Sequence, residues 1–427
     1  MDALRGVLGL LLLLGVAVLA SRDRRGIRWR IVGAALALQI VFAFLVLRTR
    51  PGQVVLDFLS RQVETLIGYT QSGTDFVFGP LAQVGAPKGV AFALQVLPVI
   101  IFLGALIYLL LYLRVIQLLT HYVGGAIGRL LGVSKVESMY AAVVVFLGMS
   151  EAPLLISPYL RRLRSAQLFT VVVAGLTAAS GSTLVGYALL GAPLPYLLAA
   201  TVMNAPAALV MAKIMWPDSV REPVEATEGA DEAPSGRETA QDEDDFDVRG
   251  VRDTESANVI DALARGALAG GRVAVAVACL LIAFVALIAL LNGVIGGIAG
   301  WFGADGVTFQ QLLGYVMAPV AWLLGVPWSE SVQAGQLIGI KTVLNEFVAY
   351  GEFGAQAGSL SPVTVVVVSF ALAGFANFGS IAIAIGALGS LRAEIRGFVA
   401  RVGLRALLAA TLANLANAAI AGLLFAR

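Results

Sequence analysis

Long runs of apolar residues, separated by short polar or basic segments, make up most of this 427-residue chain. Such runs cover residues 4–20, 31–48, 91–118, 166–190, 193–215, 271–299, 362–387 and 404–425. A helix of about 20 apolar residues crosses the hydrocarbon core of a bilayer. The pattern therefore predicts an all-α integral membrane protein with about eight transmembrane helices.

Two further apolar segments, 136–160 and 316–352, are interrupted by Gly, Pro, Ser and Glu. Each is too broken for a clean span and too apolar for an exposed loop. Irregular backbone is stable at membrane depth only where protein or a water-filled cavity covers it. Both segments are therefore predicted to be re-entrant hairpins.

Residues 51–90 have a mixed composition, with apolar positions at helical spacing in "VVLDFLSRQVETLIGY". This spacing is typical of an amphipathic helix lying at the membrane interface. We expect a second interfacial helix over 121–134.

The composition excludes several classes of function. The chain is 59% hydrophobic and 13% charged, whereas soluble domains are about 25% charged. A soluble fold could not hide this much apolar surface, so the bilayer is the expected surrounding. The formal net charge of +2 argues against a nucleic-acid partner. The single cysteine, Cys279, and the single histidine, His121, exclude an internal disulfide and a Cys- or His-based metal centre. No cofactor is expected beyond a coupling ion, H⁺ or Na⁺.

The first apolar run resembles a signal peptide, but "RDRRGIRWR" and a second apolar run follow it. This order favours a retained first span with a basic cytoplasmic loop. The arginine-rich loops together place both termini outside.

An acidic segment divides the chain. Residues 217–257 hold 14 acidic and 4 basic residues, and such a segment is expected to be disordered. A solvated cytoplasmic linker is favoured over a regulatory element. The predicted domains are 1–134 (N-terminal helices and interfacial segments, mainly scaffold), 135–215 (first repeat), 216–258 (acidic linker), 259–315 (scaffold helix and outer loop) and 316–427 (second repeat).

Two segments resemble each other: "AGLTAASGSTLVGYALLG" from Ala174 and "AGFANFGSIAIAIGALG" from Ala373. Each follows a broken hairpin with a glutamate and precedes a final span. The order hairpin, interrupted helix, span thus occurs twice, which predicts an inverted repeat. In secondary transporters this arrangement surrounds a binding site near the bilayer midplane. Chance similarity between Ala- and Gly-rich segments is the alternative.

Each predicted hairpin carries one glutamate, Glu151 or Glu346. An ionised group at the bilayer centre costs at least about 2.5 kcal/mol, so we expect both to face a polar cavity where helix N-termini stabilise them. The structural alternative for Glu346 is an ion pair with Lys341. Residues five apart are poor helical partners, and Lys341 would instead tie its hairpin to a neighbouring helix.

Three motifs, "GMSEAPLLISPYL", "KTVLNEFVAY" and "GFANFGSI", together resemble the signatures of the concentrative nucleoside transporter family, bacterial type. The resemblance covers roughly 1–215 and 258–427. It implies a homotrimer in the bacterial inner (plasma) membrane, with eight spans, two hairpins and interfacial helices. It also implies cation-coupled nucleoside import by an elevator-type movement.

Carried over residue by residue, the resemblance implies two groups of substrate-binding side chains. The nucleobase group is Met149, Ser150, Glu151 and Val185, and the ribose group is Asn345, Glu346, Phe375, Asn377 and Ser380.

The sequence departs from the family at two sites. Met149 stands where the family has glutamine, and a thioether cannot reproduce an amide at a base edge. The family's sodium site corresponds to Val144, Ser180, Gly181 and Leu184, where valine and glycine replace oxygen-bearing side chains. Since hard cations need oxygen ligands, proton coupling is favoured over sodium. Glu151 and Glu346 are the candidate proton carriers.

Two other functions remain open from sequence. Met149 favours a symporter of another polar metabolite on the same scaffold. An intramembrane hydrolase would use the two glutamates as acid and base, but the sequence has no motif for a metal, a nucleophile or a phosphate-binding loop.

Overall fold

The computed structural model describes residues 2–83, 92–220, 222, 224, 248, 251, 253, 255–304 and 306–425. The described part is helical and contains no β-strand. Seven of its helices are long and apolar enough to cross a membrane, or up to eight if one bent pair counts as a span. The predicted all-α membrane fold is therefore confirmed. Most of the acidic segment 216–258 lies outside the described residues.

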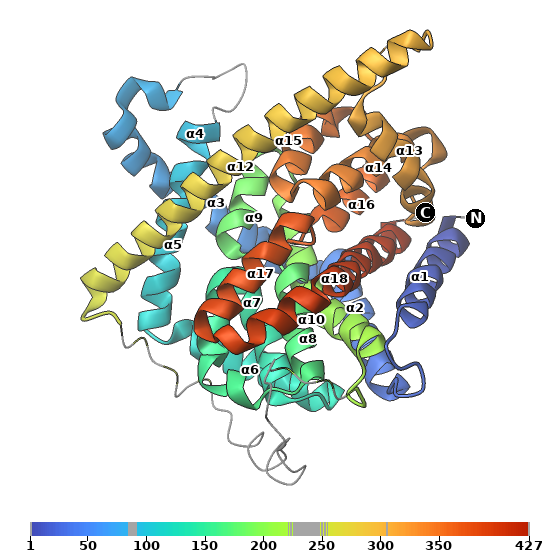
Figure 1. Ribbon diagram of the computed structural model, residues 1–427. Coiled ribbons are helices and arrows are strands. Elements are labelled where there is room, and N and C mark those ends of the chain that lie inside the picture. Colours follow the sequence, from blue (N-terminus) through green and yellow to red (C-terminus); the bar gives the residue numbers. More distant parts are fainter. Residues whose placement is uncertain are drawn as a thin grey trace.

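The N-terminal part comprises α1 (Asp2–Leu19), α2 (Trp29–Arg48), α3 (Arg50–Phe78), η1 (Gly79–Gln83), α4 (Phe92–Gln95), α5 (Leu97–Tyr112) and α6 (Val115–Leu131). Helix α3 is the predicted amphipathic helix, and the Thr49 side chain caps it by accepting from the Gly52 N–H. The apolar run 91–118 is not one helix, because Arg114 adopts a left-handed conformation (φ 61°) between α5 and α6. Helix α1 packs against the last helix of the chain, so the two ends of the described chain lie side by side (Figure 1).

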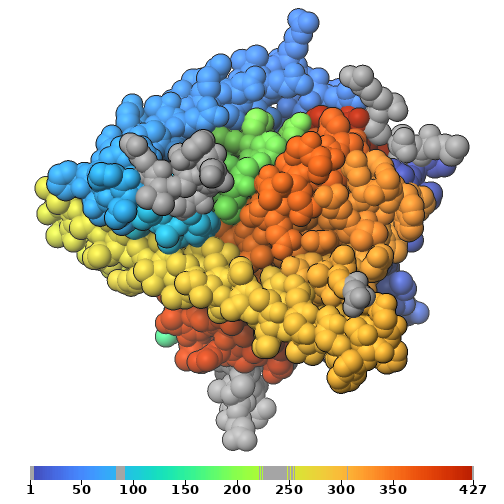
Figure 2. All heavy atoms as spheres, turned by 90° about the horizontal axis from the view of Figure 1, so that it is seen from above, coloured from blue at the N-terminus to red at the C-terminus, as the bar shows by residue number. Residues whose placement is uncertain are grey.

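The longest helix, α12 (Val259–Trp301), has 43 residues. It begins well before the apolar run predicted from 271. At 1.5 Å per residue it is about 65 Å long, roughly twice the thickness of the hydrocarbon core. Figure 1 shows α12 crossing the molecule diagonally beside α5, and Figure 2 shows it along one face. Much of its apolar surface is therefore exposed in the single chain.

The first hairpin is α7 (Lys135–Ile156) followed by η2 (Ser157–Arg162). The Ser134 side chain caps α7, accepting from the Glu137 N–H, while the Glu137 carboxylate accepts from the Ser134 N–H. The helix breaks at Gly148, where φ is 78°. A Cβ at Gly148 would lie 2.7 Å from the Cβ of Ser180. Both the backbone angle and the close approach therefore require glycine at the hairpin tip.

The second hairpin is shorter than predicted. It consists of α14 (Trp328–Val343) and α15 (Glu346–Gln356), followed by η4 (Ala357–Ser359). The prediction began the hairpin at residue 316, but residues up to Leu323 belong to a separate helix, α13 (Phe309–Leu323). Gly325 turns the chain with φ 109°, and the chain bends by 117° between α13 and α14. The apolar pattern alone does not reveal this turn.

Two broken helices follow the hairpins. In the first half they are α8 (Ser165–Thr177) and α9 (Gly181–Leu189), and the final helix is α10 (Leu194–Met215). In the second half they are α16 (Pro362–Leu372) and α17 (Phe378–Leu391), followed by η5 (Ala393–Ile395) and the final helix α18 (Arg396–Phe425). The unwound segments touch directly, because the Phe375 N–H donates to the Ala178 carbonyl at 3.1 Å. A Cβ at Gly374 would lie 2.2 Å from the Thr177 carbonyl oxygen. The two halves of the chain thus meet at their breaks.

Candidate functional site

Glu346 is buried at the first turn of α15, with 3% of its surface exposed. The Tyr187 hydroxyl donates to Glu346 Oε1 at 3.0 Å, and Asn377 Nδ2 donates to Oε2 at 2.8 Å. Asn377 also caps α17, because its Oδ1 accepts from the Ser380 N–H at 2.9 Å. The carboxylate therefore lies where the N-termini of α15 and α17 meet, and their positive dipole ends stabilise an anion there.

The other residues of the ribose group lie at or just before the starts of α15 and α17. Asn345 is buried and caps α15, accepting from the Val348 N–H at 3.0 Å. Ser380 is buried in the first turn of α17, and Phe375 is half-buried in the break before it. The structure thus brings Asn345, Glu346 and Asn377 together as the starts of two half-helices. Two of the four polar residues in the ribose group, Asn345 and Asn377, serve as helix caps.

The nucleobase group is more dispersed. Met149 is buried against Gly175 of α8, Ser150 is exposed, and Glu151 is half-buried just past the break in α7. Val185 lies on α9 and packs against Val99 and Leu103 of α5.

No hydrogen bond or ion pair within the described part of the chain joins Glu151 to Glu346. The two hairpin tips are instead connected through the breaks. Gly148 contacts Ser180, and Ala178 is bonded to Phe375. Tyr187, which sequence reasoning missed, completes the connection by reaching from α9 to Glu346.

The positions that resemble a sodium site hold few oxygen-bearing side chains. Val144 and Leu184 are buried hydrocarbon. The Ser180 hydroxyl accepts from the Thr183 N–H at 3.3 Å and lies 3.0 Å from Thr183 Oγ1. Ser182 Oγ is 3.2 Å from the same hydroxyl. The available hydroxyls therefore belong to the first turn of α9 and are bonded to one another.

Lys341 is a buried lysine, 2% exposed, on α14 of the second hairpin. Its Nζ donates to Asn414 Oδ1 at 2.8 Å and to the Ala371 carbonyl at 3.3 Å. Among the described residues, no ion pair within 4 Å joins Lys341 to Glu346. Lys341 instead ties its hairpin to α18, which confirms one of the two interpretations offered from sequence and excludes the direct pair.

Asn414 belongs to a buried polar network that sequence reasoning missed. Its Nδ2 donates to the Thr177 carbonyl of α8 at 3.0 Å, while Asn204 Nδ2 donates to the Ala373 carbonyl after α16 at 2.9 Å. Asn417 bridges Asn204 and Gln39, with donor–acceptor distances of 2.7 and 2.6 Å. The final helix of each half thus caps the broken helix of the other half.

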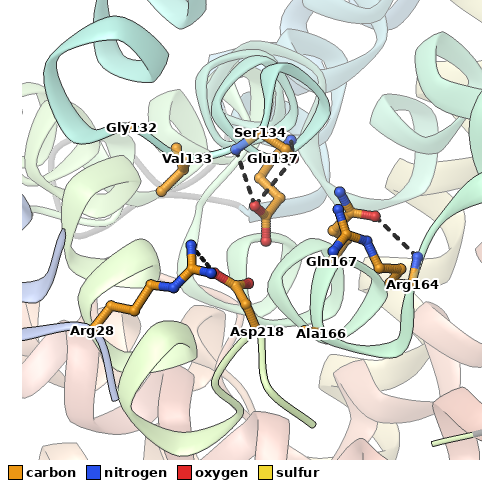
Figure 3. Close-up of a pocket in the computed structure, with 9 residues that line it drawn as sticks. All are labelled: Arg28, Gly132, Val133, Ser134, Glu137, Arg164, Ala166, Gln167 and Asp218. Atoms are coloured by element: carbon orange, nitrogen blue, oxygen red, sulfur yellow. Dashed lines mark hydrogen bonds and ion pairs between the residues drawn. The ribbon is translucent and has the colours of Figure 1, made fainter. Parts of the chain in front are cut away.

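A second polar cluster lies at the base of the first hairpin (Figure 3). Lys213 Nζ is 2.7 Å from Glu137 Oε1 and 2.5 Å from Asp218 Oδ1, and Arg28 is 3.6 Å from Asp218. The cluster borders a cavity of about 170 Å³. The full lining is Arg28, Gly132, Val133, Ser134, Glu137, Arg164, Ala166, Gln167 and Asp218. Since its acids and bases already pair with one another, this cluster anchors α7 to α10 and is not our candidate substrate site.

Comparison with known proteins identifies the chain. The profile described as "Na+ dependent nucleoside transporter C-terminus" matches residues 196–422, and the corresponding N-terminal profile matches 8–81. A third profile, "Nucleoside recognition", matches 93–194. The chain belongs to the concentrative nucleoside transporter family. It is therefore a membrane protein that carries out cation-coupled nucleoside transport. Because the family consists of transporters and not enzymes, the hydrolase alternative is excluded.

Relatives of this nucleoside transporter cover its whole length. It is 47% identical to "Uncharacterized transporter YutK" of Bacillus subtilis, over 99% of this chain and 100% of the relative. It is 40% identical to "Putative nucleoside permease NupX" of Escherichia coli, over 99% of both chains. These bacterial relatives imply that the chain is a multi-pass protein of the inner (plasma) membrane.

The fold also matches solved structures of the family. CNTnw in an inward-facing substrate-bound state is 43% identical, with a TM-score of 0.89 over 99% of this chain and 98% of that one. Variants of CNTnw in outward-facing and intermediate states are equally similar, with TM-scores of 0.88 to 0.89.

Proposed function

We propose that the chain imports nucleosides in symport with protons, and that Glu346 is the principal substrate-binding group. The observation that supports this most is the buried carboxylate of Glu346, oriented by Tyr187 and Asn377 where two half-helices begin. Charge-assisted hydrogen bonds are the stronger class, and ribose hydroxyls are suitable donors to a carboxylate. Uptake of a nucleoside by purified protein in vesicles tests the proposal.

The remaining contacts follow from the positions around Glu346. The ribose would lie between Asn345, Asn377 and Ser380, with Phe375 lining the pocket. The nucleobase would face the first hairpin at Met149, Ser150 and Glu151, with Val185 beyond. Because Met149 offers no amide at the base edge, we expect weak discrimination between bases. Competition by a panel of nucleosides against labelled uridine measures this directly, and strong preference for one base would contradict it.

Proton coupling is favoured by the side chains near the break in α8–α9. Val144 and Leu184 contribute hydrocarbon, and the Ser180 hydroxyl is already engaged with Thr183. Of the two candidate proton carriers, Glu151 is the one we assign to the proton, because Glu346 must stay ionised to accept charge-assisted hydrogen bonds from the ribose. A proton and a nucleoside that each favour the other's binding would produce symport by linkage.

The coupling ion is tested in proteoliposomes with a controlled pH and sodium gradient. We expect uridine accumulation to rise as external pH falls, to collapse with a protonophore, and to be unchanged when choline replaces sodium. A strict requirement for sodium, with no response to a proton gradient, would exclude proton coupling. Labelled uridine recovered unchanged inside the vesicles serves as the control for intact transport.

We further propose an elevator-type alternating access and a homotrimer. The states in which CNTnw variants have been solved support alternating access. The trimer is supported by α12, whose exposed apolar side chains include Ile282, Val285 and Leu290 along a helix longer than a bilayer is thick. Native mass spectrometry of the detergent-solubilised protein tests the trimer. A monomer that retains full transport would contradict it.

A further inference from the structure

Tyr187 is a buried tyrosine on α9, and its hydroxyl donates to Glu346 Oε1 at 3.0 Å. It belongs to neither the ribose group nor the nucleobase group. Among the described residues, it is one of two side chains that bond the Glu346 carboxylate. It comes from the first half of the chain, while Glu346 comes from the second. A buried tyrosine hydroxyl needs a hydrogen-bond partner, and here that partner is the proposed substrate-binding group.

The ring of Tyr187 is held rigidly by aromatic contacts. It stacks on Tyr350 with centroids 4.6 Å apart and an interplanar angle of 23°. The edge of Phe347 contacts it at 4.8 Å. The hydroxyl of Tyr350 points elsewhere and donates to the Ser369 carbonyl at 2.9 Å. Of these two stacked tyrosines, only Tyr187 bonds the carboxylate.

The hydrogen bond from Tyr187 determines which acceptor sites on the Glu346 carboxylate are left for a ligand. A carboxylate has about four lone-pair sites on its two oxygens. Tyr187 occupies one site on Oε1, and Asn377 occupies one on Oε2. The two donors therefore fix the rotation of the carboxylate plane. By this count one acceptor site on each oxygen is left for a ligand, which is the number that two neighbouring hydroxyl groups need.

We infer that Tyr187 is a positioning residue that orients Glu346 to receive the vicinal 2′- and 3′-hydroxyls of a ribonucleoside. The inference rests on the proposed function, since it concerns the same carboxylate. If Oε1 loses its tyrosine donor, the carboxylate can rotate, and the paired arrangement is lost. Recognition of a ribose should then weaken more than recognition of a 2′-deoxyribose, which never used both sites.

The test compares Tyr187→Phe with Tyr350→Phe, which removes the hydroxyl of the stacked neighbour. Counterflow KM values are measured for uridine and 2′-deoxyuridine in proteoliposomes. For Tyr187→Phe we expect the uridine KM to rise about tenfold, as for a lost hydrogen bond to a charged group, and the deoxyuridine KM to rise about twofold. The preference for ribose should thus fall about fivefold. For Tyr350→Phe both KM values should stay within about twofold of wild type.

The outcomes separate positioning from packing. A parallel rise of both KM values in Tyr187→Phe, with the ribose preference unchanged, would overturn the inference while leaving nucleoside transport intact. Absence of uridine transport by the wild type would instead overturn the proposed function, and the inference with it. If Tyr187→Phe does not fold, 3-fluorotyrosine at position 187 keeps the packing and alters the donor. A changed ribose preference then supports the inference, and an unchanged one overturns it.

Discussion

Replacing Asn414 by leucine should remove the centre of the polar network that joins the two halves of the transporter. Asn414 is fully buried on α18. Its Oδ1 accepts from Lys341 Nζ at 2.8 Å, and its Nδ2 donates to the Thr177 carbonyl at 3.0 Å. Weaker bonds reach Asn204 Oδ1 and the Ala373 carbonyl, both at 3.3 Å. Leucine has a similar size and can make none of these bonds.

The loss of stability in Asn414→Leu has two contributions. Hydrogen bonds between helices in membranes average about 0.6 kcal/mol each, so the four bonds together contribute roughly 2 kcal/mol. A buried cation left with a poor partner raises this figure, because unsatisfied buried groups cost about 1–3 kcal/mol and charged ones more. Lys341 would keep only the Ala371 carbonyl, at 3.3 Å. We therefore expect a destabilisation of about 3–5 kcal/mol.

The assay is thermal unfolding of the detergent-solubilised protein, followed by tryptophan fluorescence. The matched control is Asn417→Leu, one turn further along α18, which loses only neutral bonds to Gln39 and Asn204. We expect the unfolding temperature to fall by about 5 °C for Asn414→Leu and by less than half of that for the control. The double variant Asn414→Leu/Lys341→Met should recover part of the loss, because it also removes the buried charge.

The reasoning is refuted if Asn414→Leu unfolds at the same temperature as Asn417→Leu. It is equally refuted if removal of Lys341 in the double variant lowers stability further by an additive amount. Either result would mean that the hydrogen bond from Lys341 to Asn414 does not stabilise the buried lysine of the second hairpin.

Three further outcomes follow from the structure. Gly148→Ala should insert normally but lose most uptake of labelled uridine, because its Cβ would meet Ser180 at 2.7 Å; wild-type uptake would contradict the hairpin geometry. Lys213→Met should destabilise the protein by about 3–5 kcal/mol by leaving Glu137 buried without its cation, and Lys213→Met/Glu137→Leu should be more stable than the single variant; thermal unfolding in detergent measures both. Val144→Asn should make uptake respond several-fold to sodium in place of choline, because it restores an oxygen ligand; an unchanged response would show that this position does not decide the coupling ion.

Much of the architecture follows from sequence because the bilayer imposes simple rules. Apolar runs of about 20 residues predict spans, and an apolar segment interrupted by glycine and glutamate predicts re-entrant backbone. Family motifs then placed Glu346 and Asn377 at one site, where the structure shows them bonded to each other. The boundary at Gly325 was missed, since a tight turn between two apolar helices leaves the average hydropathy unchanged.

Pairings between distant polar residues could not be predicted. Tyr187 and Glu346 are 159 positions apart, and Asn414 and Asn204 are 210 apart. A polar residue in an apolar span shows that a partner is needed but does not show which one. One signal was available: Ala-Ala-Thr-x-x-Asn occurs at 199–204 and again at 409–414. These are the two asparagines that each cap the other half's broken helix.

The central claim is that the buried carboxylate of Glu346 binds the nucleoside. Calorimetric titration of uridine into purified wild-type protein and into Glu346→Gln tests it most directly, because glutamine keeps the size of the side chain and removes its charge. The account predicts about a hundredfold weaker affinity for Glu346→Gln, as for two lost charge-assisted hydrogen bonds, with an unchanged gel-filtration profile. Equal affinity in the two proteins would contradict it.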